Sequence, residues 1–256
     1  NRANLKRWVF KLFLPSLLII LTFRFYLGYD FMPKGFIPRN EFHGWDDWAK
    51  DIANTTGGLP VVFHNSFQKP SKYMFYSGKF AHAVNSVNYA GFHYDLLIER
   101  EELLQGKTVF RIHDYGKDSI CAGGIQMLRY DIEENFRYFN RIKIRLPQNC
   151  FQVPRDTILT IPIKIENPTE KVVDFSGVPK ENRKLLYCLF WYGEWKETTL
   201  ALPEFPIERL KPGETFETTV QIKTPKSSGK HWRFRFAIET NGFVGRNSNF
   251  ASLEIK

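Results

Sequence analysis

The hydrophobic positions of the chain change their spacing along its length, and each spacing predicts a different element. Near the start they form an almost continuous apolar stretch from Trp8 to Phe31, whose uncharged centre runs from Leu12 to Phe23. A helix needs about 20 apolar residues to cross a bilayer, so the centre alone is too short. Lys11 and Arg24 lie at its flanks, however, where long charged side chains reach the lipid headgroups. The stretch therefore predicts a transmembrane helix.

The flanks of this stretch predict its orientation. Basic residues gather before it, at Arg2, Lys6, Arg7 and Lys11, and the cytoplasmic flanks of membrane helices carry such an excess. Residues after about 32 would then lie outside the cytoplasm. A cleaved signal peptide also has a basic start and a short apolar core, but bulky residues from Arg24 onward occupy the place of a small-residue cleavage site. A buried helix of a soluble protein is the third interpretation.

Shorter hydrophobic runs, separated by Gly, Pro and polar residues, follow this stretch. They predict helices over residues 44–54, 69–75 and 99–104, and strands over residues 59–63, 80–84, 94–98 and 109–113. Asp46 and Asp47 stand where negative charge favours a helix start. Helices that alternate with short strands indicate a small α/β unit. We place it within residues 33–146, after a membrane segment of residues 1–32.

From Pro147 onward the hydrophobic residues alternate with polar ones. The alternation is clearest over residues 158–165, 215–222 and 232–238, and turn signals such as Asn241-Gly242 separate the runs. Several short strands punctuated by turns are typical of a β-sandwich. The sequence thus predicts an α+β chain that has an N-terminal transmembrane helix, a small α/β unit and an antiparallel immunoglobulin-like β-sandwich over residues 147–256.

Composition argues for folded cores and against nucleic acid as a partner. Of the 256 residues, 43% are hydrophobic and 16% are aromatic, which is ample for one or two domains. The formal net charge is +9 at pH 7, but the basic residues are spread along the chain and no nucleic-acid-binding motif occurs. Attraction to an anionic bilayer surface fits the predicted helix better. An ordinary solvated surface with a modest basic excess explains the same charge.

A cluster of polar side chains follows the apolar run Leu59–Phe63. The candidate binding residues in it are Asn65, Ser66, Gln68, Lys72, Tyr73 and Tyr76. Amide and hydroxyl groups could hold sugar hydroxyls or a phosphate, an aromatic ring could stack on a sugar face, and a lysine could neutralise phosphate charge. The alternative is a structural turn, in which the same groups cap a helix start and satisfy loop backbone.

The same stretch resembles a pattern in one family of membrane enzymes. The residues that carry the resemblance are Asn65-Ser66-Phe67-Gln68, Ser71-Lys72-Tyr73 and Phe75-Tyr76-Ser77-Gly78. The pattern is similar to the soluble portion, after the last membrane helix, of bacterial GT-C glycosyltransferases related to protein mannosyltransferases and aminoarabinose transferases. These enzymes use polyprenyl-phosphate sugars. The resemblance covers residues 45–95 well and the remainder loosely.

The resemblance implies a place and a role for the chain. It would be the last transmembrane helix and the extracytoplasmic C-terminal part of a transferase in the bacterial inner membrane. Its partners would be the lipid bilayer, a polyprenyl-phosphate sugar and a glycan, lipid or protein acceptor. The catalytic acidic residue of such enzymes lies in an early extracytoplasmic loop, outside this region. The chain alone is then expected to be inactive.

A search for catalytic chemistry agrees with that expectation. Ser66 and Lys69 match an SxxK pattern only by spacing, because Pro70 follows and no partner motif occurs downstream. The six histidines form no metal-binding pair, and the three cysteines show no CxxC spacing. We therefore predict no catalytic residue, no metal site and no cofactor. The alternative function is a membrane-anchored glycan- or protein-binding module without catalytic activity. A soluble hydrolase would need an acid–base pair that the sequence does not offer.

Overall fold

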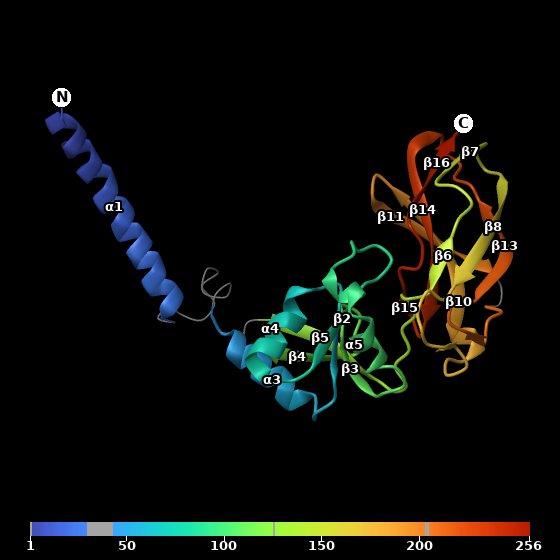
Figure 1. Cartoon of the computed structure of the whole chain (residues 1–256), viewed down its shortest axis with the longest axis horizontal. Coiled ribbons are helices and arrows are strands. Elements are labelled where there is room, and N and C mark those ends of the chain that lie inside the picture. The colour runs from blue at the N-terminus through green and yellow to red at the C-terminus, as the bar shows by residue number, and fades with distance from the viewer. Residues whose placement is uncertain (1, 30–42, 125, 203–204) are drawn as a thin grey trace.

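The computed structural model of the chain describes residues 2–29, 43–124, 126–202 and 205–256. Figure 1 shows helix α1 at one end of the molecule and a sheet with helices next to it. A group of further sheets, which holds the C-terminus, lies at the other end. The fold is thus a mixed α+β arrangement with one N-terminal apolar helix, as the sequence predicts.

Helix α1 (Arg2–Gly28) carries most of its basic residues in its first three turns, and from Leu12 onward it is mainly apolar and largely exposed. Its segment Lys6–Gly28 has a mean hydropathy of 1.7 and, within the described residues, is the helix that is long and apolar enough to cross a membrane. A membrane anchor and a signal sequence share these properties. The predicted continuation to Phe31 and the predicted boundary at residue 32 lie outside the described residues. Near the end of α1, the carbonyl oxygen of Tyr26 lies 2.8 Å from Nε2 of His43, a residue that comes shortly before the next helix in the sequence.

The next part is built on a five-stranded sheet with the order β2-β1-β3-β5-β4. Its strands are β1 (Val61–His64), β2 (Ala81–Val84), β3 (Val109–Ile112), β4 (Asp118–Ala122) and β5 (Gln126–Glu133). Strand β1 lies in the middle of a parallel group because it pairs in parallel with both β2 and β3. The hairpin of β4 and β5 extends the sheet in the antiparallel sense.

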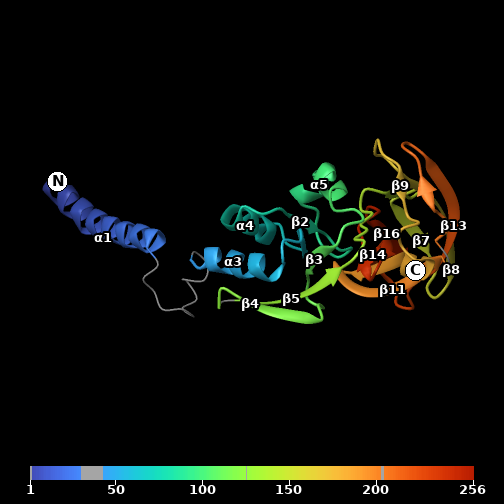
Figure 2. The same cartoon turned by 90° about the horizontal axis from the view of Figure 1, so that it is seen from below.

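Two helices cover one face of this sheet (Figures 1 and 2). Helix α3 (Trp45–Thr55) and helix α4 (Gln68–Ser77) bury a shared core with the strands, in which Trp48 stacks on Phe63 with ring centroids 6.0 Å apart. On the opposite face, Val62 of β1 and Val84 of β2 belong to a second hydrophobic cluster, which also includes Phe243. Burial on both faces explains why the parallel strands read as apolar runs in the sequence.

One predicted strand, over residues 94–98, is wrong. The chain forms a short 3-10 helix, η1 (His93–Leu96), and then helix α5 (Ile98–Glu102). The cause is local, because the Asp95 carboxylate accepts a hydrogen bond from the backbone N–H of Phe92 at 3.2 Å and closes a turn. Tyr94 is buried, and its ring lies edge-on to that of His82 at 5.5 Å. Tyr94, the first residue of the predicted strand, is therefore buried as part of a turn.

The C-terminal part contains the remaining sheets. The largest has the order β11-β10-β14-β16-β7 with β15 paired to β14, a second has the order β13-β8-β6, and β12 pairs with β9. The strands are β6 (Lys143–Arg145), β7 (Cys150–Val153), β8 (Ile158–Glu166), β9 (Val173–Asp174), β10 (Arg183–Trp191), β11 (Glu194–Leu202), β12 (Arg209–Leu210), β13 (Thr215–Lys223), β14 (Gly229–Thr240), β15 (Phe243–Val244) and β16 (Ala251–Ile255), and a 3-10 helix, η2 (Lys180–Asn182), precedes β10.

These sheets share one hydrophobic core. It joins Ile161 and Val220 of the three-stranded sheet to Phe234, Phe236 and Leu253 of the large sheet. The sheets are therefore rich in antiparallel pairs around a common core, although β16 and β7 pair in parallel. The immunoglobulin-like type stays a prediction. Strand β6 pairs with β8 and precedes the predicted domain start at residue 147.

The loop after β2 joins the two parts. Val87 donates its backbone N–H to the carbonyl oxygen of Val244 at 3.0 Å, and its own carbonyl oxygen accepts a hydrogen bond from Arg235 at 3.1 Å. Val87 also packs with Phe190 and Ala237 in a small apolar cluster. The carboxyl end of the parallel strands is thereby held against the large sheet.

Candidate functional site

The carboxyl ends of β1, β2 and β3 meet at one edge of the five-stranded sheet. In open α/β sheets, ligands bind in the crevice outside this edge. Here a cleft of about 490 Å³ opens there. It is lined by His64, Asn65, Ser86, Asn88, Tyr89, Arg111, His113, Asp114, Tyr115, Asp131, Trp195, Asn241, Gly242, Phe243 and Val244. We call it the edge cleft.

Asn65 fixes the floor of the edge cleft. Its backbone has φ of 55°, in the left-handed region that Asn tolerates better than most residues. Its Oδ1 accepts hydrogen bonds from the backbone N–H and from the hydroxyl of Ser86, both at 2.9 Å. The amide thus ties the end of β1 to the end of β2.

A chain of charged and polar groups crosses the edge cleft from β3 to β5. His113 Nε2 lies 2.7 Å from the Asp131 carboxylate, and Arg111 lies 3.6 Å from Asp131 and 2.9 Å from Glu133. Residues two apart on a strand share a face, and Arg111 is opposite Asp131 in the antiparallel register. The pairing of β3 with β5 therefore assembles the group.

Burial and neighbouring charges set the protonation of these groups. Burial lowers the pKa of His64 well below its usual value, and the positive charges of Arg111 and His113 lower it further. Burial also lowers the pKa of His113, although the hydrogen bond to Asp131 opposes this. Burial by itself raises the pKa of Asp131, but hydrogen bonds from Lys117 and His113 lower it overall. Near pH 7 the two imidazoles are thus neutral beside an ionised Asp131.

Exposed aromatic rings complete the edge cleft. Tyr115 is 89% exposed, Tyr89 is 46% exposed and Trp195 is 41% exposed. Rings of this kind offer a flat apolar face with a polar tip. Within the described residues, Nε2 of His64 is buried without a hydrogen-bond partner. The edge cleft therefore combines stacking surfaces with unsatisfied hydrogen-bonding capacity.

The structure places the sequence-predicted residues in different surroundings. Asn65 lines the edge cleft. The hydroxyl of Ser66 accepts the backbone N–H of Lys69 at 3.2 Å, in the first turn of α4, and Gln68 is exposed at the start of that helix. Both groups thus belong to the helix start.

The three remaining predicted residues lie along α4. The Lys72 ammonium lies 3.3 Å from the centre of the Trp45 ring. Tyr73 is fully buried in the core beneath α4, so its ring is not available for stacking on a ligand. Tyr76 is 41% exposed, and its ring meets that of Phe75 edge-on at 4.9 Å. The structure therefore does not gather the six residues into one pocket.

Sequence reasoning missed the group of Arg111, His113, Asp131 and Glu133. The available signal was the period of two in Arg111-Ile112-His113 and in Asp131-Ile132-Glu133, which places charged groups on one face of each strand. Among the described residues, no group of three or more His, Cys, Asp or Glu side chains could hold a metal ion.

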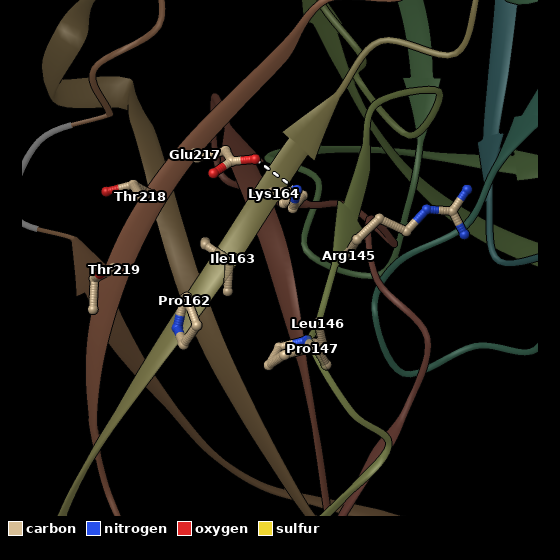
Figure 3. A pocket seen from close by; sticks show the side chains of 9 residues that line it. All are labelled: Arg145, Leu146, Pro147, Pro162, Ile163, Lys164, Glu217, Thr218 and Thr219. Carbon is tan, nitrogen blue, oxygen red and sulfur yellow. Dashed lines mark ion pairs between the residues drawn. The ribbon is translucent and has the colours of Figure 1, made fainter.

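A second depression, of about 280 Å³, lies over β6, β8 and β13 (Figure 3). Its floor carries Pro162 and Ile163, and the Lys164–Glu217 ion pair of 2.6 Å crosses it. Both charged side chains are well exposed, so the pair contributes little to stability. Arg145 points away from this pair in Figure 3. The charged groups Lys164 and Glu217 neutralise each other, and the depression lacks the imidazole, amide and aromatic side chains that line the edge cleft.

The chain was compared with protein-family models, with curated proteins and with solved structures. No protein-family model and no curated protein matches it. Among solved structures, it is similar to Pseudomonas fluorescens alkylpurine DNA glycosylase AlkC bound to DNA containing an abasic site analogue, with 12% identity, a TM-score of 0.29, and coverage of 46% of this chain and 31% of that chain.

Two further structures are similar at the same low level. AvmM, which catalyses macrocyclization in alchivemycin A biosynthesis, gives 12% identity and a TM-score of 0.26, with coverage of 48% of this chain and 93% of that chain. The teleost fish polymeric immunoglobulin receptor ectodomain gives 8% identity and a TM-score of 0.25, with coverage of 59% and 93%. At these TM-scores the likenesses carry no argument about fold or activity.

Proposed function

We propose that the edge cleft binds the sugar portion of a glycan or lipid-linked sugar, and that the chain is a non-catalytic, membrane-tethered recognition part. The observation that carries the proposal is the edge cleft itself. It brings Asn65, the Asp131–His113 pair and the exposed rings of Tyr115 and Trp195 to the carboxyl edge of the parallel strands.

The chemistry of the edge cleft suits a sugar. A pyranose presents hydroxyl groups around its rim and C–H groups on its faces, so it needs hydrogen-bonding groups beside an aromatic surface. Amide, imidazole and carboxylate groups of the edge cleft supply the hydrogen bonds, and the Trp195 and Tyr115 rings supply the aromatic surface. Asp131 and Arg111 are held by each other and by their neighbours, which keeps the polar wall in place.

For the whole protein, we propose the extracytoplasmic C-terminal part of a bacterial membrane glycosyltransferase that uses a polyprenyl-phosphate-linked sugar. This proposal rests on the resemblance of the stretch 65–78 and on α1, and the comparisons add nothing to it. Asn65, the first residue of that stretch, lines the edge cleft. The bilayer would be the partner of α1, in the bacterial inner membrane, with the sheets on the extracytoplasmic side.

The binding test uses the full chain in a neutral detergent, screened against an array of immobilised glycans. We expect saturable binding of at least one glycan, and a loss of at least about tenfold in affinity for Trp195→Ala and Tyr115→Ala. Tyr192→Ala is the matched control, because Tyr192 is 67% exposed and does not line the edge cleft. No glycan binding, or equal losses in all three variants, would remove the sugar proposal.

The second candidate is a membrane-anchored binding module without an enzymatic parent. Helix α1 fits this candidate as well as the first, because it is long and apolar enough to cross a membrane. The native gene separates the candidates. Several further membrane helices encoded upstream of Asn1 would support the transferase, and a start codon just before Asn1 would support the anchor.

A further inference from the structure

A separate cleft of about 520 Å³ lies where η1 and α5 meet the C-terminal sheets. We call it the basic cleft, because its lining includes Arg141, Lys143, Arg145 and Arg246, against the acidic residues Asp95 and Glu101. It shares no lining residue with the edge cleft. Asn247 and Ser248 also line it, but their side chains are buried and hydrogen-bond to the backbone of Ile238, Phe139, Ile142, Phe236 and Asn249.

Two of the basic residues form ion pairs with carboxylates outside the basic cleft. Arg141 lies 3.1 Å from Glu102, and Arg145 lies 2.6 Å from Glu166. Neither carboxylate lines the basic cleft. These two pairs hold the wall together, and they leave Lys143 and Arg246 as the other sources of positive charge.

The positive charges of Lys143 and Arg246 have weaker contacts with carboxylates than those of Arg141 and Arg145. The Lys143 ammonium donates a hydrogen bond to the carbonyl oxygen of Asn140 at 3.0 Å, and within the described part of the chain it has no carboxylate within 4.0 Å. Arg246 approaches Asp95 only to 3.8 Å, which is beyond hydrogen-bond distance. Their charges are therefore available to an anion in the basic cleft.

Glu101 is an unsatisfied buried group in the same lining. Glu101 is 6% exposed, and its Oε1 has no hydrogen-bond partner among the described residues. Burial raises its pKa to about 8, against the lowering effect of Arg141 and Lys143, while Asp95 and Glu102 raise it further. Tyr138, whose own pKa burial raises, also faces it. At pH 7 the carboxyl group is therefore mainly neutral and can donate a hydrogen bond.

We propose that the basic cleft binds a phosphate group, held by Lys143 and Arg246 and by a hydrogen bond from the Glu101 carboxyl group. The neutral carboxyl adds a donor without adding repulsion, and the two cations supply the charge that phosphate oxygens require. The proposal is independent of sugar binding at the edge cleft. The phosphate could belong to a soluble compound or to a lipid headgroup.

The test measures anion binding to the full chain in neutral detergent by calorimetry, with inorganic phosphate and with sulfate as probes. We expect saturable binding of both probes at pH 6.5, and an affinity at least about tenfold weaker in Lys143→Ala and in Arg246→Ala. Arg155→Ala is the matched control, because it removes the same charge at an exposed turn outside the basic cleft. No saturable binding below about 10 mM, or equal effects in all three variants, would overturn the proposal.

A pH series tests the Glu101 hydrogen bond. Sulfate stays a dianion across this range, so a change in its affinity reports the protein. We expect wild-type affinity to fall as the pH rises above about 8, because an ionised Glu101 repels the anion. Burial also lowers the pKa of Lys143, so we expect Glu101→Gln to show a clearly smaller fall in affinity between pH 6.5 and 9. Parallel pH profiles of wild type and variant would refute the role of Glu101.

A competition experiment distinguishes the two sources of phosphate. The full chain is placed in nanodiscs made of a zwitterionic lipid, with or without an anionic phospholipid, and titrated with inorganic phosphate. If the anionic lipid weakens phosphate binding in the wild type and has no effect on the residual binding of Lys143→Ala, the natural ligand is a headgroup. Unchanged phosphate binding in both kinds of nanodisc assigns the basic cleft to a soluble phosphate compound.

Discussion

Asn65 joins the ends of two parallel strands, because its side-chain oxygen accepts both the backbone N–H and the hydroxyl of Ser86 at 2.9 Å. Its backbone is also in the left-handed region. The residue therefore has two structural requirements, a side-chain acceptor and a tolerated positive φ. A ligand that enters the edge cleft meets a floor that is already fixed.

Replacing Asn65 should separate these two requirements. Asn65→Ala removes the acceptor and places a less tolerant residue at positive φ, so we expect a loss of about 2–3 kcal/mol in the free energy of unfolding. Asn65→Gly removes only the acceptor and should lose about 1 kcal/mol less. Urea unfolding of the full chain in detergent measures both values. Equal losses would show that backbone strain is unimportant at this position.

Lys72 should contribute to stability and not to ligand binding. Its ammonium lies over the Trp45 ring, and such contacts contribute about 0.5–1 kcal/mol at exposed sites. We expect Lys72→Met to lower the free energy of unfolding by about that amount, and to leave glycan affinity unchanged because Lys72 does not line the edge cleft. A loss of glycan affinity with unchanged stability would restore the sequence-based role of Lys72 as a ligand contact.

His82 should make the fold less stable in mild acid. The residue is 1% exposed, and burial, assisted by Arg100, lowers its pKa to about 4. The unfolded chain therefore takes up a proton near pH 6.5, before the folded chain does. The contribution of neutral His82 to the free energy of unfolding is fully present above about pH 6.5. It falls by roughly 3 kcal/mol as the pH approaches 4.

Variants isolate this effect from the other titrating groups. We expect His82→Gln to show a shallower fall in unfolding free energy between pH 7 and pH 5 than the wild type, measured by urea unfolding at each pH. His231→Gln is the control, because His231 is exposed. Identical pH profiles for wild type and His82→Gln would show that His82 is not held neutral by the fold.

Asp131 should control the titration of His113. The hydrogen bond and charge of Asp131 raise the pKa of His113, against burial and the charge of Arg111. Removing the negative charge in Asp131→Asn should therefore lower the pKa of His113 further. An NMR titration of the imidazole signals measures the change. An upward shift would mean that the two side chains are not paired in solution.

Helix α1 should tolerate charge at its ends better than at its centre. An arginine in the middle of a membrane helix costs about 2.5–3.5 kcal/mol of insertion free energy, whereas one near the end reaches the headgroups. Ile19→Arg should thus reduce membrane insertion more than Leu27→Arg, measured by in vitro translation into membrane vesicles. Equal insertion of the two variants would argue against a helix that spans the bilayer.

The elements that the sequence predicted correctly are those whose burial pattern is local. Helix α3 follows an amphipathic pattern, and β8 and β13 alternate buried with exposed residues. The hairpin of β4 and β5 was missed, because three of the five residues of Asp118–Ala122 are exposed and the strand is defined by its pairing with β5. The parallel pairing of β7 with β16 joins residues about a hundred positions apart, and no local signal reveals it.

The candidate site was only partly predictable for the same reason. Asn65 was found because it directly follows a buried strand. Ser66 and Tyr73 were grouped with it by proximity in sequence, but helical geometry turns Ser66 to the start of α4 and Tyr73 into the core. The Asp131–His113 pair depends on the register of β3 with β5, which residue types alone do not specify.

Strand β16 lies inside the large sheet, between β14 and β7, although it is formed by Ala251–Ile255. During synthesis, β7 and β14 leave the ribosome while the strand that separates them is still being made. Strand β16 can pair with β14 and β7 only after residue 255 has emerged, so the edge of β14 that pairs with β16 stays open until then. A chain truncated before β16 would therefore leave an unpaired strand edge, and such edges promote aggregation.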